Sequence, residues 1–182
     1  TSPKRTHNRE KIFELATRLS VWTKKGSYGV LFDGATTLDI KKKVVHFELG
    51  MIPESMKELK TACGLLITGV IRQKIMTMPR NLRKRLIFEE VARFLDVPGG
   101  EQIVSEAYAQ LRKFGCQTMA IVQQYAQFKN SRIRPILIGN SKQFFIMRQQ
   151  DKKDLEDLSK DINLSESAQE AIKNFVLPEY QP

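Results

Sequence analysis

Apolar residues recur at helical spacing in several parts of the chain, and the residues that bound these stripes mark helix ends. Pro79 ends the second stripe because proline cannot continue a helix. Gly115 ends the third because glycine adopts the left-handed conformation found after helices. Asp151 and Ser165 stand where side chains cap helix amino-termini. The stripes predict helices over residues 8–24, 54–76, 101–114, 151–162 and 165–175.

Apolar runs that are too short for helices alternate with these stripes. They predict strands over residues 28–32, 44–49, 86–88, 116–122 and 144–147, with a loop around Pro135 and Gly139. Helices between strands imply crossover connections and a mainly parallel sheet. Because the runs are continuously apolar, we expect the strands to be buried on both faces. The pattern predicts an α/β fold in three layers, a mainly parallel sheet with helices on both faces.

The composition is that of an ordinary globular protein. The chain has 182 residues, of which 41% are hydrophobic and 27% charged, which fits one domain with its own core or a large fragment of a bigger protein. Its apolar runs fall short of the roughly 20 residues that cross a bilayer, so a soluble, intracellular protein is expected. Cys63 and Cys116 lie apart in apolar segments without a CxxC motif, which favours buried thiols over a metal site.

Charge is distributed unevenly along the chain. The net charge is +10; residues 1–150 carry 26 Lys and Arg against 12 acidic residues, whereas residues 151–182 carry 4 against 8. The basic body favours nucleic acid, acidic partners or lipid headgroups, although a solvated basic surface explains the counts as well. The acidic tail fits either a solvated amphipathic cap or a partner-binding pair of helices.

Polar side chains follow two of the predicted strands. Glu89-Glu90 follows one strand, Gln123-Gln124 follows the other, and the helix between them ends in Arg112-Lys113. Alone, the acidic pair fits the start of a helix, and the other residues fit solvated ends of elements. Ligands bind at the carboxyl ends of parallel strands. Together the carboxylates, amides and cations form the set that phosphoryl transfer to water needs.

LIFEEVARFLDVPGGEQIVSEAYAQLRKFGCQTMAIVQQYAQF (residues 86–128) resembles the Walker B-to-glutamine segment of the conjugation and type IV secretion ATPases of the VirB/TrbE/TraC kind. GSYGVLFDGATTLDIKKKVVHFELGMI and RIRPILIGNSKQFFIMRQQDKKDLEDL are similar to the family's flanking stretches, so the resemblance covers residues 26–158. It implies a RecA-like P-loop NTPase core that binds ATP and Mg²⁺ and acts as a hexamer. It also implies a cytoplasmic location at the bacterial inner membrane, with secretion-complex proteins as partners and DNA as a further candidate.

Matched to the family position by position, Glu90 corresponds to the catalytic glutamate that polarises the lytic water. Glu89 corresponds to the Walker B residue that holds Mg²⁺ through water, and Gln124 to the glutamine that senses the γ-phosphate. The resemblance implies that further polar residues face the phosphates, some of them across a subunit boundary. These residues are Gln123, Arg112, Lys113, Arg132 and Arg134.

Two departures from the family's pattern matter. Glu89 stands where the family usually has aspartate, so the geometry around Mg²⁺ would have to adjust. The sequence also lacks GxxxxGKS and GxxxxGKT, the loop whose N–H groups and lysine bind the β- and γ-phosphates. We therefore expect the C-terminal part of an ATPase domain, with a helical lead-in (1–25), a core portion carrying Walker B (26–150) and an acidic helical segment (151–182).

The leading interpretation is an ATPase that energises type IV secretion or conjugative DNA transfer. A DNA-translocating motor of the same superfamily is an alternative that the basic charge suits. A third interpretation is a non-catalytic α/β docking module, in which Glu89-Glu90 is only the start of a helix.

The missing phosphate-binding loop leads to a direct expectation for the 182-residue chain. Without the donors of that loop, the chain alone should bind ATP weakly or not at all. Steady-state ATP turnover of the purified chain should therefore lie far below that of the intact protein. Comparable turnover would contradict the interpretation as part of a larger ATPase domain.

Overall fold

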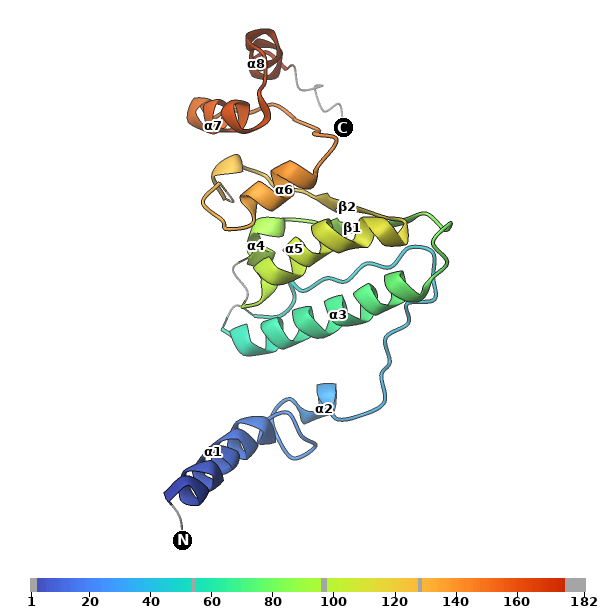
Figure 1. Ribbon diagram of the computed structural model, residues 1–182, viewed down its shortest axis with the longest axis vertical. Coiled ribbons are helices and arrows are strands. Elements are labelled where there is room, and N and C mark those ends of the chain that lie inside the picture. The colour runs from blue at the N-terminus through green and yellow to red at the C-terminus, as the bar shows by residue number, and fades with distance from the viewer. Residues whose placement is uncertain (1–2, 54, 96–97, 128, 176–182) are drawn as a thin grey trace. The chain divides into compact units, whose positions relative to one another are not determined.

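The structure, a computed structural model, describes residues 3–53, 55–95, 98–127 and 129–175 (Figure 1). The chain divides into two compact units, residues 1–51 and 52–182. The first unit holds α1 (Pro3–Ser20) and α2 (Gly29–Phe32). The second holds α3 (Lys57–Thr77), β1 (Lys84–Phe88), α4 (Val91–Leu95), α5 (Gly100–Gln110), the 3₁₀ turn η1 (Leu111–Phe114), β2 (Cys116–Ala120), the 3₁₀ turn η2 (Tyr125–Gln127), α6 (Arg134–Asn140), α7 (Lys152–Ile162) and α8 (Glu166–Lys173).

In the first unit an aromatic cluster turns the chain back after α1. The Trp22 ring packs against Tyr28, with ring centroids 4.8 Å apart, and against Phe32 at 5.0 Å. Gly29, which follows Tyr28, approaches Thr23 so closely that a Cβ there would lie 1.8 Å from the Thr23 carbonyl oxygen. Only glycine, which has no Cβ, allows the chain to come this close at the start of the single helical turn α2.

Three expected strands are wrong. Residues 28–32 contain the turn α2, and residues 44–49 and 144–147 have no regular structure. A strand needs a neighbour that satisfies its backbone groups, and no described segment pairs with these residues. Several of their apolar side chains consequently stay in solvent; Val30, Val44 and Phe145 are 92%, 84% and 80% exposed.

β1 and β2 form a parallel pair, and the strands predicted there are confirmed. Lys84 lies opposite Cys116 and Phe88 opposite Ala120, while α4, α5 and η1 form the crossover between them (Figure 1). The predicted crossover helix is confirmed too, although its last turn is the 3₁₀ turn η1. It ends where predicted, at Gly115, whose φ of 73° is left-handed.

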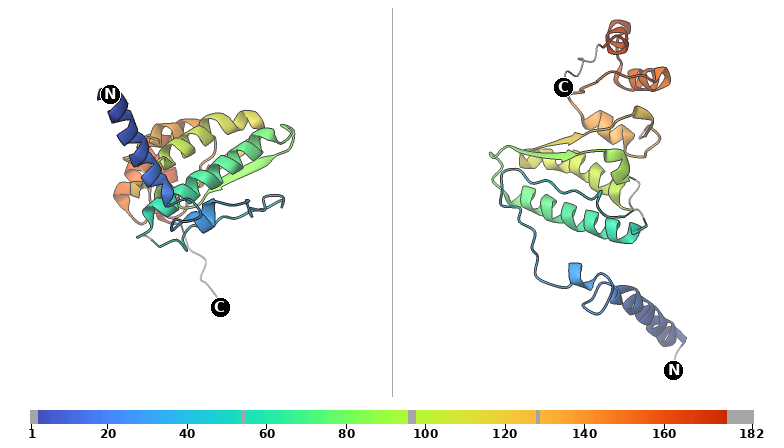
Figure 2. Two further views of the ribbon diagram at one scale, coloured as in Figure 1. Left: turned by 90° about the horizontal axis from the view of Figure 1, so that it is seen from below. Right: turned by 180° about the vertical axis from the view of Figure 1, so that it is seen from behind.

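Helices cover one face of this sheet. Leu86 and Phe88 of β1 pack into the core with residues of α3 and α5. On the other face Ile87 and Ile121 are 49% and 44% exposed, and the view from behind in Figure 2 shows the strands in front of α5. The described residues thus form a mixed α/β fold with a small parallel sheet. The expected helical layer on the second face is not among them.

Lys84 joins β1 to the end of α3. Its ammonium donates to the carbonyl oxygens of Met78 (3.3 Å) and Pro79 (2.9 Å), and more distantly to that of Ile75 (3.4 Å). These carbonyl groups lie at the carboxyl end of the helix, where the helix dipole is negative and the C=O groups have no helical partner. The contacts satisfy the half-buried cation and fix α3 against the sheet.

A short helix replaces the loop that the sequence predicts around Pro135 and Gly139. Pro135 occupies the first turn of α6, where the missing N–H of proline leaves no helical hydrogen bond unmade. The side chain of Asn140 donates to the Ile136 carbonyl at 2.9 Å in the last turn. Proline therefore starts an element here instead of marking a loop.

The two tail helices begin where the sequence predicts. The carboxylate of Asp151 accepts the backbone N–H groups of Lys153 (2.8 Å) and Asp154 (3.2 Å), and the Ser165 hydroxyl accepts that of Ala168 (3.2 Å). The final residues of the expected tail, 176–182, lie outside the described residues, as does Glu54 at the expected start of α3. None of the described helices is both long and apolar enough to cross a membrane.

The two cysteines are free thiols, Cys116 buried and Cys63 half-buried. Burial raises the pKa of both thiols, so both are protonated and poorly nucleophilic at neutral pH. The prediction of a buried thiol is confirmed for Cys116, which belongs to the hydrophobic core, whereas Cys63 is only partly buried.

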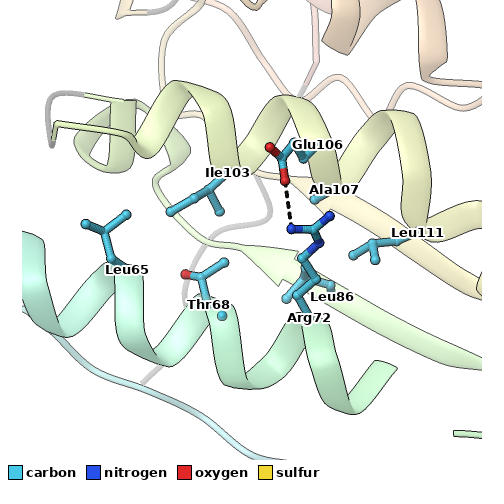
Figure 3. A pocket seen from close by; sticks show the side chains of 9 residues that line it. Leu65, Thr68, Arg72, Leu86, Ile103, Glu106, Ala107 and Leu111 are labelled. Atoms are coloured by element: carbon cyan, nitrogen blue, oxygen red, sulfur yellow. Dashed lines mark ion pairs between the residues drawn. The ribbon is translucent and has the colours of Figure 1, made fainter. Parts of the chain in front are cut away.

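A cavity of about 110 Å³ lies between α3, α5 and β1 (Figure 3). Its lining is mainly apolar and includes Leu65 and Ile103. Arg72 also lines it, with its guanidinium 3.0 Å from the Glu106 carboxylate and 3.0 Å from the Gln110 side-chain oxygen. The same contacts tie α3 to α5.

Two glycines are expected to respond to alanine in opposite directions. Gly69 lies within α3 at the cavity, and a Cβ there would meet nothing within 4 Å. Gly69→Ala should raise the free energy of unfolding by about 1 kcal/mol. Gly115→Ala should lower it by at least ~1 kcal/mol, because φ is positive and a Cβ would lie 2.3 Å from the Arg80 carbonyl oxygen. Urea unfolding measures both; a destabilised Gly69→Ala chain would contradict the first.

Candidate functional site

The carboxyl ends of β1 and β2 meet at one edge of the sheet. Backbone pairing continues past the strands: the Ile121 N–H donates to the Phe88 carbonyl (2.9 Å), and the Val91 N–H donates to the Ile121 carbonyl (3.0 Å). Glu89-Glu90 forms a turn between these two hydrogen bonds. Gln123 follows Ile121 by two residues, so the parallel pairing brings it beside that turn.

Glu90 has an uncommon backbone conformation. Its φ is 48°, in the left-handed region that costs a residue with a Cβ about 1 kcal/mol or more. Its carbonyl accepts the Arg93 N–H at 2.9 Å in the first turn of α4, and the next residue, Val91, is 0% exposed. The buried anchor and the helix start hold the turn in place. Strain of this kind is concentrated at functional sites in proteins.

The Glu90 carboxylate makes two short polar contacts. The Gln123 side-chain N–H donates to one oxygen at 2.6 Å, and the Arg93 Nε lies 2.8 Å from the other. The Glu90 side chain is 33% exposed, so it stays accessible to water. This carboxylate can hold a water molecule or accept its proton while an amide and a cation keep it oriented.

A hollow of about 50 Å³ opens at this carboxylate. Glu90, Arg93 and Gln123 line it together with Ala92 and Gln127, and it has room for on the order of a few water molecules. Sequence reasoning missed Arg93 and Gln127. The spacing of Arg93, three residues after Glu90 at a helix start, was a usable signal. The sequence contains no such signal for Gln127, because the turn η2 brings this residue to the hollow.

Glu89 and Gln124 do not line this hollow. Glu89 is exposed and forms no hydrogen bond or ion pair with a described residue, so its carboxylate is free for a ligand. Gln124 is exposed as well, and its backbone N–H makes a long contact with the Gln127 side-chain oxygen at 3.4 Å. Of the two glutamines predicted at the strand end, Gln123 is the one that meets Glu90.

Arg112 and Lys113 lie at the opposite end of the sheet from Glu90. They belong to η1, which precedes β2, and the register places that end beside Lys84. The strand between has five residues, a length of roughly 17 Å at 3.3 Å per residue. Both side chains are exposed. Within one chain the structure does not bring this pair to the acidic turn.

Arg132 and Arg134 lie near α6, away from the acidic turn. The Arg132 backbone N–H donates to the Glu101 carboxylate at 3.3 Å, while its side chain is exposed. The Arg134 guanidinium lies 3.4 Å from the Asp161 carboxylate. Neither contacts Glu90.

The TraG P-loop domain family matches residues 3–177 of the chain. The chain belongs to this family. Membership makes it a P-loop domain related to the ATPases of conjugative transfer and indicates binding of a nucleotide. No curated protein and no solved structure is a significant match to it.

Magnesium normally accompanies a nucleotide in P-loop domains, and this TraG P-loop domain offers carboxylates that suit it. The described residues hold no cluster of three or more metal-binding side chains. Mg²⁺ needs no such cluster, because it takes one or two carboxylates together with phosphate oxygens and waters. Glu89, whose carboxylate is free, and Glu90 beside it meet that requirement.

One face of α7 holds the turn that follows β2 in this TraG P-loop domain. Asp154 is 4% exposed and accepts the Ala126 N–H at 3.1 Å. Asp161 accepts the hydroxyl of Tyr125 and pairs with Arg134. The acidic tail is therefore not simply solvated, because this face binds the chain's own loop.

Asp157, between these two residues, forms an ion pair with Lys129. The ammonium lies 2.9 Å from the carboxylate. The hydrogen bond from Lys129 lowers the pKa of the Asp157 carboxyl, and the same contact raises the pKa of Lys129. Each shift favours the charged form, so the pair stabilises the docked α7 wherever both residues are ionised.

This pair should make stability depend on pH at both extremes. The lowered pKa of Asp157 means that its contribution is present above the ordinary value of 3.8 and is lost as pH falls through the folded value. The raised pKa of Lys129 means that its contribution is present below 10.5 and is lost as pH rises through the folded value.

Asp157→Asn should therefore lower the melting temperature most between about pH 5 and 9, and the difference should shrink as pH falls below 3.8. Thermal melts across this range measure the effect, with Glu156→Gln, an exposed neighbour on α7, as the control for charge. The effect at mid pH should also shrink in high salt. A melting difference that is the same at pH 2 and pH 7 would contradict the assignment.

Proposed function

We propose that this chain is the part of an ATPase that carries the lytic carboxylate, and that the intact protein uses ATP hydrolysis to energise conjugative DNA transfer or type IV secretion. The observation that carries the proposal is the 2.6 Å hydrogen bond from Gln123 to Glu90 across the ends of two parallel strands. An acidic helix start needs no such partner. A water-activating carboxylate gains orientation from it.

Each residue of the turn has a role in this proposal. Glu90 orients the attacking water and accepts its proton, because its carboxylate borders the hollow. Gln123 holds that carboxylate in position and senses the γ-phosphate; the role that the family resemblance implies for Gln124 is transferred to it. Glu89, aided by Glu90, holds Mg²⁺ through water. Bound with ATP, that ion neutralises charge on the phosphates.

The phosphate-binding loop comes from outside this chain in the proposal, since the sequence contains no GxxxxGKS or GxxxxGKT. The exposed face of the sheet around Ile87 and Ile121 supports this, because parallel sheets are covered on both faces. A complete RecA-like core of three layers would cover it. The boundaries 1–25, 26–150 and 151–182 belong to the same proposal.

Arg112 and Lys113 act in the proposal on the nucleotide of a neighbouring subunit. Their exposed position at the far end of the sheet from Glu90 supports an action in trans. That arrangement requires a ring, and a hexamer at the cytoplasmic face of the bacterial inner membrane, in contact with secretion-complex proteins, is the assembly we infer. Arg132 is a further candidate for such an arginine, since its side chain is exposed; Arg134 is engaged by Asp161.

A DNA-translocating motor is the second candidate function. The net charge of +10 favours it, because cationic surfaces bind the phosphate backbone. DNA binding that weakens steeply with salt, together with DNA-stimulated hydrolysis, would distinguish this motor from a secretion ATPase.

Substitutions at the acidic turn test the ATPase in the intact protein. Glu90→Gln should lower kcat by roughly a hundredfold or more and leave ATP binding in place, because the amide cannot accept the proton of water. Gln123→Ala should lower kcat more than Gln124→Ala does, since Gln123 alone of the two contacts Glu90. The measurements are ATP turnover and equilibrium binding of a fluorescent ATP analogue. Unchanged turnover and transfer in Glu90→Gln would instead support the docking module.

A further inference from the structure

We propose that Asp154 of α7 is a positioning residue for this site, holding the turn after β2, and through it Gln123, against Glu90. The inference rests on the proposed function, because it assigns a use to the contact between Gln123 and Glu90. It goes beyond that function by giving the acidic C-terminal helix a part in the chemistry at the strand ends.

The environment of Asp154 is unusual for a carboxylate. It is 4% exposed, and among the described residues it forms no ion pair; its carboxylate accepts the backbone N–H of Ala126 at 3.1 Å. Taking a carboxylate out of water costs several kcal/mol unless polar partners replace the water. The polar partner that the structure shows for this buried carboxylate is the backbone of η2.

α7 is itself held firmly enough to act as a support. Leu155 is 1% exposed, and Leu158 packs against the hydrophobic core. Asp157 and Asp161 lie on the same face of the helix as Asp154, at spacings of three and seven residues. Asp157 binds Lys129, and Asp161 binds Tyr125. Three carboxylates of one helix thus hold the segment that begins just after Gln124.

The turn η2 transmits this support to the site. Tyr125 is 4% exposed, and hydrogen bonds close the turn from Gln127 N–H to the Gln124 carbonyl (3.2 Å) and from Lys129 N–H to the Tyr125 carbonyl (3.1 Å). Ala126 lies three residues after Gln123, whose amide binds Glu90. On its other side the segment is held to β1 through the Ile121 N–H. Gln123 therefore lies between two fixed points, and Asp154 supplies one of them.

Loss of Asp154 is therefore expected to free the turn and weaken the Gln123–Glu90 contact without touching the nucleotide. The effect should fall on kcat and leave KM for ATP nearly unchanged. An asparagine at this position keeps an oxygen that accepts the Ala126 N–H. Asp154→Asn should consequently retain most of the function that Asp154→Ala loses.

The first test uses the 182-residue chain and needs no ATPase activity. In Asp154→Ala, amide exchange at Ala126 should rise roughly tenfold or more, and the NMR signals of the Gln123 side-chain amide should move toward those of a free glutamine. Asp154→Asn should stay close to the wild type. Glu156→Ala removes an exposed carboxylate from the same helix and should change neither signal.

A second set of chains separates a loss of the Gln123 contact from a general loss of stability. The same substitutions are made in the Gly69→Ala background, and melting temperatures are recorded, so that chains of equal stability can be compared. Unmoved Gln123 signals in a folded Asp154→Ala chain overturn the positioning role. So does an Asp154→Asn chain that loses the Gln123 contact as fully as Asp154→Ala.

The second test measures ATP turnover in the intact protein with Glu90→Gln as the reference. Asp154→Ala should lower kcat at least fivefold, with KM changed less than twofold. An active Glu90→Gln protein overturns the proposed function, whatever Asp154 does. An inactive Glu90→Gln protein together with a fully active Asp154→Ala protein overturns only the positioning role. A rise in turnover in Asp154→Ala overturns it as well, since a support cannot raise the rate when removed.

Discussion

The parallel pairing of β1 with β2 is the constraint on which the rest of the second unit depends. Two parallel strands cannot be joined by a tight turn, so the chain must cross over between them. That crossover supplies α5, which packs with α3 on one face of the sheet and builds the core. The same pairing places both strand carboxyl ends at one edge, where Glu90 and Gln123 meet. The parallel pairing therefore accounts both for the core of the second unit and for the position of the candidate site.

Charged side chains then hold the helices and the segment after β2 in place. Lys84 binds the carbonyl groups at the end of α3, and Arg72 joins α3 to α5. At the other edge, α7 binds the segment after β2 through Asp154 and its neighbours. The contacts of Arg72 and Asp154 link segments that are far apart in the sequence, whereas those of Lys84 join β1 to the nearby end of α3. The left-handed turn at Glu90 can persist because structure on both sides restrains it.

Local signals predicted most helices and both paired strands. Gly115 and the caps Asp151 and Ser165 are read from a few neighbouring residues, and all three were predicted correctly. The strands expected at 28–32, 44–49 and 144–147 failed because apolar content alone cannot supply a pairing partner. At the site, the acidic turn was recognisable from its place after a strand. Arg93, Gln127 and the choice of Gln123 over Gln124 depended on how the chain turns afterwards.

By itself the sequence determined the helix ends at Gly115, Asp151 and Ser165, which two runs become the parallel strands, and that carboxylates and amides follow them. Its motifs also pointed to the family that the chain belongs to. These properties are local, set by backbone preferences and by residue order. The tertiary structure decided which polar groups meet. It brought Gln123 to Glu90, placed Arg112 and Lys113 at the far end of the sheet, and turned the acidic face of α7 onto its own loop. Such contacts depend on distances across the fold, which residue order does not express.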